Sequence, residues 1–196
     1  MKRAKLATWK DYFENTKNNP PRPLLVKALE SVNKKNEALD FGSGALNDSK
    51  YFLLQNFKHV TALDKVDVAH DVAKDLPKER FDYVISSFEE FNFPENFFDI
   101  VNAQYALPFI SPNQFKRVFM NMFNSLKNGG ILTGQFFGDR DEWKDNPNMT
   151  FLNKEEVYFY LKDYKIIYFQ EEEKDKTSKK SEAKHWHLFH FIVQKI

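Results

Sequence analysis

Acidic residues and glycines stand together where two short apolar runs end. Asp40 lies near the end of the run at 38–41, Gly42 and Gly44 follow it, and Asp64 closes the run at 59–64. A glycine pair directly after a strand lets the backbone come close to a ligand. A carboxylate at the first position repels a pyrophosphate but suits an ammonium group, and an acid ending the second strand is placed for ribose hydroxyls. The pattern indicates a nucleoside ligand with a positively charged amino-acid tail.

A dinucleotide is the main alternative ligand, because it binds at a related turn. Its fingerprint, Gly-x-Gly-x-x-Gly/Ala, needs a small residue where this chain has Asn47. That departure and the charge of Asp40 count against an NAD-dependent oxidoreductase, which we keep as an alternative function.

The segments that must position these residues alternate between strand and helix patterns. Strand-like runs occupy 38–41, 59–64, 81–86, 98–103 and 131–137, and helical patterns occupy 4–16, 23–32, 45–54, 66–75 and 111–126. Gly129 and Gly130 are predicted to end the last of these helices. A further helix is expected over 153–161, and β-rich runs at 164–171 and 186–195 close the chain.

Strands that alternate with helices predict an α/β fold with right-handed crossovers. The order of strand then helix, repeated five times, gives a three-layer, open, mostly parallel seven-stranded sheet. The last two strands have no helix between them and must be antiparallel, which ends the sheet in a C-terminal hairpin. We expect one domain over 1–196, made of a helical cover (1–33), a cofactor-binding core (37–137) and an acceptor-side loop, helix and hairpin (138–196).

The composition excludes several classes of protein. Hydrophobic residues make up 42% and charged residues 29% of 196 residues, which is typical of a folded domain, and the 21 phenylalanines predict an aromatic core. A formal charge of only +1 argues against a dedicated nucleic-acid binder. The absence of cysteine excludes disulfides and zinc–thiolate sites. No signal-peptide pattern or apolar run of the ~20 residues that span a bilayer is present, so we expect a cytoplasmic protein.

Several spaced motifs resemble those of class I (Rossmann-like) S-adenosylmethionine-dependent methyltransferases, in detail over 37–137. In chain order they are the first glycine motif Asp40-Phe41-Gly42-Ser43-Gly44, the ribose acid Asp64, the adenine-flanking loop 87–93, the fourth-strand motif 98–107 and the turn into strand five at 126–132. Two positions depart from the family pattern, because Ser87 stands where an acid is common and Leu46 replaces a third glycine.

The resemblance implies S-adenosylmethionine as cofactor and S-adenosylhomocysteine as its product. Asp40 would hold the methionine ammonium, the turn Gly42-Ser43-Gly44 would bring backbone to the methionine and ribose, and Asp64 would accept the ribose hydroxyls. The other implied cofactor residues are Lys65 along the adenosine, Ser87 and Phe88 beside adenine, and Gln104 and Tyr105 facing the reacting centre.

Methyl transfer from a sulfonium requires donor, methyl group and acceptor to be aligned for in-line displacement, with a base where the acceptor is a hydroxyl or an amine. We predict a small-molecule acceptor, because the charge is balanced and no recognition domain is appended; a protein or RNA acceptor is the alternative. The candidate catalytic residues are Tyr105, Asp139 and Arg140, and the candidate acceptor-binding residues are Trp9, Tyr12, Arg22 and Trp143.

The closing strand carries a histidine cluster. Strand alternation puts His185 and His187 on one face and Trp186 on the other. No third ligand with suitable spacing is visible, so we predict no metal, and the strand is expected to form an edge or to line a pocket. The segments 138–143 and 184–187 resemble bacterial small-molecule methyltransferases of the tellurite-resistance type, which does not identify the acceptor. A monomer or a homodimer is expected.

Overall fold

The computed structural model describes residues 8–178 and 181–196. Its centre is a sheet with the strand order β3-β2-β1-β4-β5-β8-β7, and the short β6 pairs with β5. The strands are β1 (Glu37–Phe41), β2 (His59–Asp64), β3 (Phe81–Ile85), β4 (Phe98–Ala103), β5 (Leu126–Gly138), β6 (Phe151–Leu152), β7 (Tyr164–Ser178) and β8 (Ser181–Lys195). Strands β1 to β5 pair in parallel, and β8 is antiparallel to both β5 and β7. The predicted sheet and its antiparallel hairpin are confirmed, with β6 as an addition.

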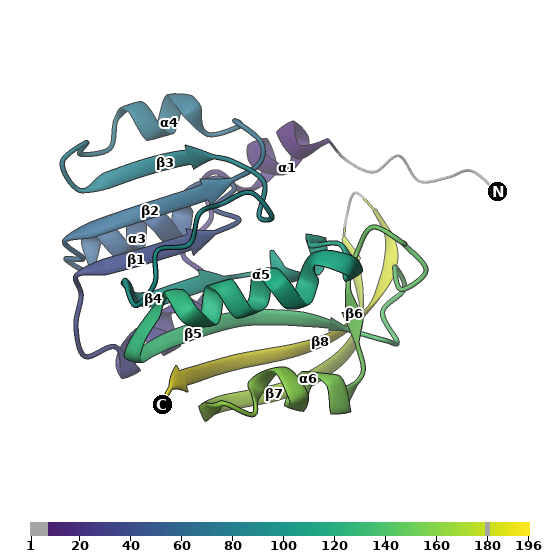
Figure 1. The fold of residues 1–196 in the computed structure, drawn as a ribbon. Coiled ribbons are helices and arrows are strands. Elements are labelled where there is room, and N and C mark those ends of the chain that lie inside the picture. The colour runs from purple at the N-terminus through teal and green to yellow at the C-terminus, as the bar shows by residue number, and fades with distance from the viewer. Residues whose placement is uncertain (1–7, 179–180) are drawn as a thin grey trace.

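Helices cover both faces of the sheet and make three layers (Figure 1). One face of the sheet, called the α2/α3 face here, packs against α2, α3 and α4. The other, called the α5/α6 face, packs against α5 and α6. The helices are α1 (Trp9–Thr16), α2 (Pro23–Ala28), α3 (Asn47–Leu54), α4 (His70–Lys74), α5 (Pro112–Ser125) and α6 (Lys154–Leu161). The helix predicted at 4–16 is seen from Trp9 onward, and residues 4–7 lie outside the described ranges.

The core is aromatic, as the composition predicts. Ten phenylalanines are among the largest fully buried side chains, and rings from α5, α6 and β5 pack edge to face or stacked on the α5/α6 face. Such ring pairs contribute about 0.5–1.5 kcal/mol each beyond the area that they bury.

The expected alternation of strand and helix is wrong between β3 and β4. Residues 86–97 are all described and contain no helix. Instead Phe88 stacks on Phe41 with ring centroids 4.0 Å apart, and Phe91 lies edge-on to Phe93 at 4.8 Å. These rings pack on the α5/α6 face. The loop therefore covers with side chains the part of the sheet that a crossover helix would cover.

The glycine pair at 129–130 does not end a helix, contrary to prediction. Helix α5 ends at Ser125, whose hydroxyl donates to the Met122 carbonyl at 2.8 Å, and buried Leu126 already begins β5. The glycines lie inside β5, where its register with β4 shifts between Phe98 and Ile100. A Cβ at Gly130 would stand 2.8 Å from the Lys127 carbonyl oxygen, so this irregularity needs glycine.

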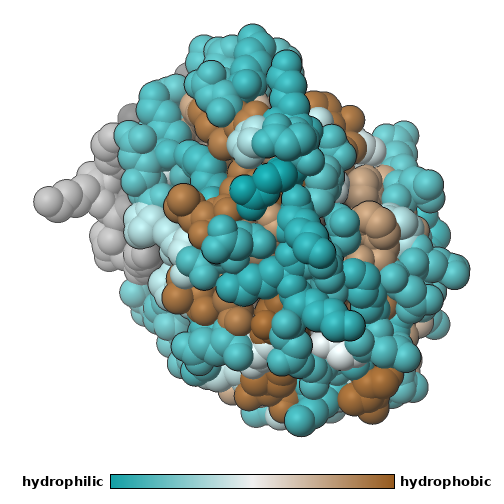
Figure 2. Space-filling model, turned by 90° about the vertical axis from the view of Figure 1, so that its left-hand side faces the viewer, coloured by the Kyte–Doolittle hydropathy of each residue, from teal (hydrophilic) through white to brown (hydrophobic). Residues whose placement is uncertain are grey.

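The parallel strands all end on the same edge of the sheet, and Figure 2 views the molecule from the opposite edge, where they begin. Hydrophilic residues cover most of that face and divide its apolar residues into separate patches. Among the described residues, no helix combines the length and apolar character needed to cross a bilayer.

We predict that Gly134→Ala lowers the free energy of unfolding by about 1–3 kcal/mol, the usual cost of overpacking a core. A Cβ at Gly134 would lie 2.5 Å from the Ala103 carbonyl oxygen across the β4–β5 pairing, and backbone cannot yield there. Urea unfolding measures the change. Asn128→Ala, at an exposed position of the same strand, should stay within about 0.5 kcal/mol of the wild type; equal stabilities for both variants would contradict the packing of β5 on β4.

Candidate cofactor and acceptor site

The loop after β1 turns the chain into α3 and is tied to β2. Gly42, Gly44 and Leu46 all have positive φ, at 77°, 49° and 61°. The amides of Gly42 and Ser43 donate to the Leu63 carbonyl at 2.8 and 3.0 Å. This holds the predicted first motif at the carboxyl ends of β1 and β2, where ligands bind in open α/β sheets.

The two glycines of this loop have different structural reasons. A Cβ at Gly42 would stand 2.6 Å from the Ala106 Cβ, so Gly42 gives room to the segment after β4. A Cβ at Gly44 would meet nothing within 4 Å. Gly44 is therefore the glycine that presents bare backbone to open space.

Asp64 fastens the end of β2 to the same loop. One of its carboxylate oxygens accepts the Gly44 amide at 2.8 Å, and the other accepts the Val66 amide at 3.0 Å. Each carboxylate oxygen can accept more than one hydrogen bond, so Asp64 keeps acceptor capacity for two hydroxyl groups.

A buried pair of carboxylates lies behind the loop. Asp40 is 3% exposed, and it accepts hydrogen bonds from the Ser49 hydroxyl at 2.5 Å and the Asn102 amide at 3.0 Å. The same Asn102 amide nitrogen donates to Asp48 at 3.0 Å. Burial, and then the charge of Asp48, raise the pKa of Asp40 to about 7, and burial raises the pKa of Asp48 as well. The pair disfavours full ionisation until a cation arrives.

The Ser43 hydroxyl adds an unfilled polar group, since it is buried and has no hydrogen-bond partner among the described residues. Buried polar groups without a partner are rare in folded proteins and call for an explanation, such as a ligand. The carboxylate pair, the bare backbone at Gly44 and the Ser43 hydroxyl fit a cofactor that carries an ammonium group and hydrogen-bonding atoms.

The amino-terminal helix crosses over this edge of the sheet. The Trp9 ring lies edge-on to Phe109, which follows β4, with centroids 5.4 Å apart, and the Lys65 ammonium, which follows β2, lies 5.8 Å from the Trp9 ring. Asn47, which replaces the small residue of the dinucleotide fingerprint, donates from its side chain to the Thr16 carbonyl at 2.7 Å. Helix α1 is thus fastened over the carboxyl ends of β2 and β4.

Arg22 links the cover to the segment after β4. Its guanidinium donates to the Tyr12 hydroxyl at 2.7 Å and lies 4.9 Å from the centre of the Tyr105 ring. Its backbone amide donates to Asp48 at 2.8 Å. Four residues predicted for the acceptor side or the reacting centre, Trp9, Tyr12, Arg22 and Tyr105, are therefore gathered around one part of the crevice.

Tyr105 is held in an unusual backbone conformation, with φ at 57°. Its amide donates to the Gln135 side chain at 2.8 Å. Burial raises the pKa of the Tyr105 phenol, against the opposing charge of Arg22. A left-handed conformation costs a non-glycine residue about 1–2 kcal/mol, and such residues cluster at functional sites.

The residues predicted beside adenine take two different positions. Phe88 is buried, stacks on Phe41 and lies against Gly42. The Ser87 hydroxyl donates to the Glu90 carboxylate at 2.8 Å and begins the following turn. Phe88 is therefore a core side chain at the rim of the crevice.

Trp143 belongs to an aromatic cluster on the acceptor side, together with Phe137, Trp186 and the partly buried Tyr105. The Lys184 ammonium lies 3.6 Å and 3.3 Å from the ring centres of Trp143 and Trp186. It also pairs with the fully buried Asp141 at 2.9 Å. This cation fastens the base of the hairpin to the segment after β5.

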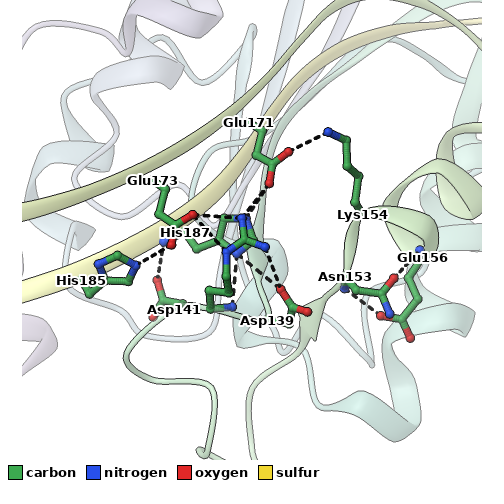
Figure 3. A network of polar contacts seen from close by, with 10 residues as sticks. Asp139, Asp141, Asn153, Lys154, Glu156, Glu171, Glu173, His185 and His187 are labelled. Carbon is green, nitrogen blue, oxygen red and sulfur yellow. Dashed lines mark hydrogen bonds and ion pairs between the residues drawn. The ribbon is translucent and has the colours of Figure 1, made fainter.

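Among the described residues, no contact joins Asp139 or Arg140 to Tyr105. Arg140 pairs with Glu171 and Glu173 of β7, at 2.8 and 2.9 Å, and contacts His187 of β8 (Figure 3). Hydrogen bonds, first to Lys154 and then to Arg140, lower the pKa of Glu171 to about 2. Alternation along the strands puts this network on the α5/α6 face.

Figure 3 also shows His185 and His187, which both contact acidic residues of this network, in agreement with their predicted common face. The fully buried His187 lies 3.6 Å from Asp139, and the more exposed His185 pairs with Glu173 and Asp175. Among the described residues, no group of three or more His, Asp or Glu side chains is arranged to hold a metal ion.

Sequence reasoning missed the polar groups on the other side of the hairpin. His190 contacts Glu172 at 3.1 Å and the Gln135 amide at 3.4 Å. Glu172 and Lys174 lie close enough to Tyr105 to affect its pKa. The sequence signal for His190 was the alternation of side chains along the strand, which puts it on the same face as Trp186. Its position near Tyr105 depends on the pairing of His190 with Gln135 of β5, which the sequence does not specify. Two surface hollows of about 300 and 400 Å³, beside α3 and between α5 and α6, are separate from this site.

Sequence comparison assigns the core of the chain to a family. Residues 39–133 match the family model described as a methyltransferase domain. These residues are a methyltransferase domain, and the chain has the class I methyltransferase fold. S-adenosylmethionine is its cofactor, which agrees with the cation-favouring pair behind the glycine loop and excludes the NAD-dependent alternative. A sequence comparison with curated proteins finds no match.

Solved structures of methyltransferases have the same fold. TehB from Haemophilus influenzae matches with a TM-score of 0.77 and 17% identity, over 97% of this chain and 68% of TehB. A 1,6-didemethyltoxoflavin-N1-methyltransferase from Burkholderia thailandensis, solved with 1,6-didemethyltoxoflavin and S-adenosylhomocysteine, matches with 0.69 and 18%, over 99% of this chain and 93% of that one. A methyltransferase from Methanosarcina mazei matches with 0.64 and 18%, over 90% and 99%. At these identities the likeness shows the fold and leaves the acceptor open.

We predict that S-adenosylhomocysteine, which keeps the ammonium group, binds more tightly as the pH rises through about 7. The pKa of Asp40 is raised to about 7 in the free protein, and a neighbouring cation favours its ionised form, so binding releases a proton below that pH. Calorimetry in buffers of different ionisation enthalpy measures both effects.

Asp40→Asn is the matching variant. It should weaken binding about 10-fold or more and remove the pH dependence, because a charge-assisted hydrogen bond is lost. In the free protein a raised acid pKa means that stability falls between pH 3.8 and about 7. The variant should therefore melt at the same or a higher temperature above pH 7. Unchanged affinity and pH dependence would contradict the assignment of Asp40.

Proposed function

We propose that the protein transfers a methyl group to a small molecule by in-line displacement. The observation that carries this proposal is the position of Trp9, which contacts residues beyond both β2 and β4 and so closes α1 over the crevice. A small molecule fits under such a cover, whereas a protein or RNA segment would have to displace it. The Burkholderia methyltransferase, which was solved with 1,6-didemethyltoxoflavin bound, supports the same class of acceptor.

The geometry around the glycine loop supports the cofactor-binding roles that we propose. Asp40, with Asp48 behind it, holds the ammonium, and Asp64 uses its free lone pairs for the ribose hydroxyls. The Ser43 hydroxyl and the Gly44 backbone bind the intervening atoms. The remaining cofactor contacts that we propose are Lys65 along the adenosine, Ser87 and Phe88 at the adenine edge, and Gln104 and Tyr105 at the reacting centre.

The bound cofactor supplies an activated methyl group. The chain's own residues then align the acceptor and exclude water. Tyr105 and Trp9 provide aromatic walls, with Trp143 further along the acceptor side, and Arg22 and Tyr12 provide polar contacts from the cover. Arg22 pairs with no carboxylate side chain at ion-pair distance among the described residues, which suits an acceptor or cofactor carboxylate.

His190 is the best-placed proton acceptor. Its Nε2 lies 3.1 Å from the Glu172 carboxylate, and its Nδ1 lies 3.4 Å from the Gln135 amide nitrogen. For a hydroxyl or amine acceptor, we propose that the acceptor displaces the Gln135 contact and gives its proton to Nδ1 as the new bond to carbon forms, while Nε2 donates to Glu172. We assign Asp139 and Arg140 to holding the hairpin, because their partners lie on the α5/α6 face.

Asp64→Ala should weaken S-adenosylmethionine binding on the order of 10-fold or more, as expected when a charge-assisted hydrogen-bond pair is removed. Calorimetry measures the dissociation constant. Asp71→Ala, which removes an exposed carboxylate of α4, should bind like the wild type. An Asp64→Ala variant with unchanged affinity would refute the placement of the ribose.

The acceptor is tested by supplying radiolabelled cofactor with pools of metabolites, peptides and RNA. Label should enter the metabolite pool, and His190→Gln should lower the turnover of a hydroxyl or amine acceptor by about 10²–10⁴ without changing cofactor affinity. His185→Gln, on the other face of β8, should keep wild-type turnover. Transfer to peptides or RNA alone would overturn the proposed acceptor class.

A further inference from the structure

Three buried side-chain amides form a line across the sheet. The Gln135 amide of β5 donates to Gln104, just beyond β4, at 2.8 Å, and Gln104 donates to Asn102 of β4 at 2.9 Å. Asn102 then donates to both Asp40 and Asp48, at 3.0 Å each. All three amides are at most 8% exposed. The line joins the acceptor side of the crevice to the carboxylate pair.

The direction of this line is fixed from the Tyr105 end. The Tyr105 backbone N–H can only donate, so the Gln135 atom that it contacts is the carbonyl oxygen, and the Gln135 nitrogen must face Gln104. Gln104 then presents its nitrogen to the Asn102 oxygen, so Asn102 must face Asp40 and Asp48 with its nitrogen. Every amide in between accepts on oxygen and donates from nitrogen in the same sense.

Amides aligned in this way polarise one another, and the effect is strongest in a dry interior. A cation beside Asp40 brings the carboxylate pair to full negative charge and strengthens the bonds from Asn102. The gain passes through Gln104 to Gln135 and so to the Tyr105 amide. Tyr105 needs such support because it stands at positive φ.

We propose that Gln135 is a positioning residue that holds Tyr105 in its left-handed conformation and couples that conformation to the charge at Asp40. Cofactor binding then stiffens the acceptor side before the acceptor arrives. The inference rests on the proposed placement of the cofactor ammonium at Asp40. The alternative is that the three amides are not coupled to Asp40 and only satisfy one another's hydrogen bonds in the buried interior.

A double-mutant cycle on S-adenosylhomocysteine affinity tests the coupling. Gln135 and Asp40 share no hydrogen bond in the described residues, and independent sites have additive effects. Gln135→Met should weaken binding about 3- to 10-fold in the wild-type background and less than about 2-fold in the Asp40→Asn background. Gln194→Met, the same substitution at a half-buried glutamine of β8 that donates to the Gly129 carbonyl, should change affinity in neither background.

The outcomes separate the two proposals. If Asp40→Asn binds like the wild type, the placement of the ammonium is wrong and the coupling is overturned with it. If Asp40→Asn binds weakly but Gln135→Met costs the same factor in both backgrounds, only the coupling is overturned.

Hydrogen exchange of the Tyr105 amide gives a second readout, which also serves if Gln135→Met fails to fold. Gln104→Met interrupts the line but leaves the bond between the Tyr105 amide and Gln135. In the wild type and in Gln194→Met, S-adenosylhomocysteine should slow exchange of the Tyr105 amide severalfold, and in Gln104→Met at saturating ligand it should not. Equal slowing in all three proteins would overturn the proposal.

Discussion

The rest of the site depends on two carboxylates buried side by side without a full complement of positive charge. Asp40 lies near the end of β1, Asp48 lies in the first turn of α3, Asn102 of β4 bridges them, and the Arg22 amide reaches Asp48 from the cover. Four separate segments therefore meet at this pair. A buried charge is costly unless it is paired, so the free protein keeps its carboxylate pair short of full ionisation. In the proposed placement the cofactor ammonium relieves that cost, which makes cofactor affinity and local instability two aspects of one arrangement.

The two faces of the hairpin divide the work. On the α5/α6 face, Arg140, Glu171 and His187 form a network that joins β7 and β8 to the segment after β5. On the α2/α3 face, Glu172 and His190 approach Gln135 and Tyr105. In the proposed mechanism, neighbouring residues of one strand thus serve stability and chemistry separately, because successive side chains of a strand point to opposite faces.

The cofactor half of the site could be predicted from sequence because its residues lie at strand ends. Asp40, Gly44 and Asp64 are placed by local signals: an apolar run, a glycine turn and an acid at the next strand end. The partners of Asp40 could not be predicted in this way, since Asp48 and Asn102 reach it only through the packing of α3 and β4. The face taken by Arg140 depends on the register of β5 with β8, which no local pattern specifies. Likewise the segment at 86–97, between two predicted strands, is long enough for a helix. It forms a loop instead, and its phenylalanines cover the sheet.

The cover explains how a site closed by Trp9 can still admit ligands. Helix α1 has no buried residue. Its side-chain links to the rest of the chain include the Trp9 ring contacts, the bond between Tyr12 and Arg22, and the bond from Asn47 to Thr16. An element with little buried surface opens at a small fraction of the free energy of global unfolding. Opening of α1 therefore leaves the sheet and the carboxylate pair in place, while Arg22, fixed to Asp48 through its backbone, marks the point about which the cover moves. In the proposed arrangement the cofactor therefore binds at the ends of sheet strands, and the acceptor is bounded by α1, an element with little buried surface.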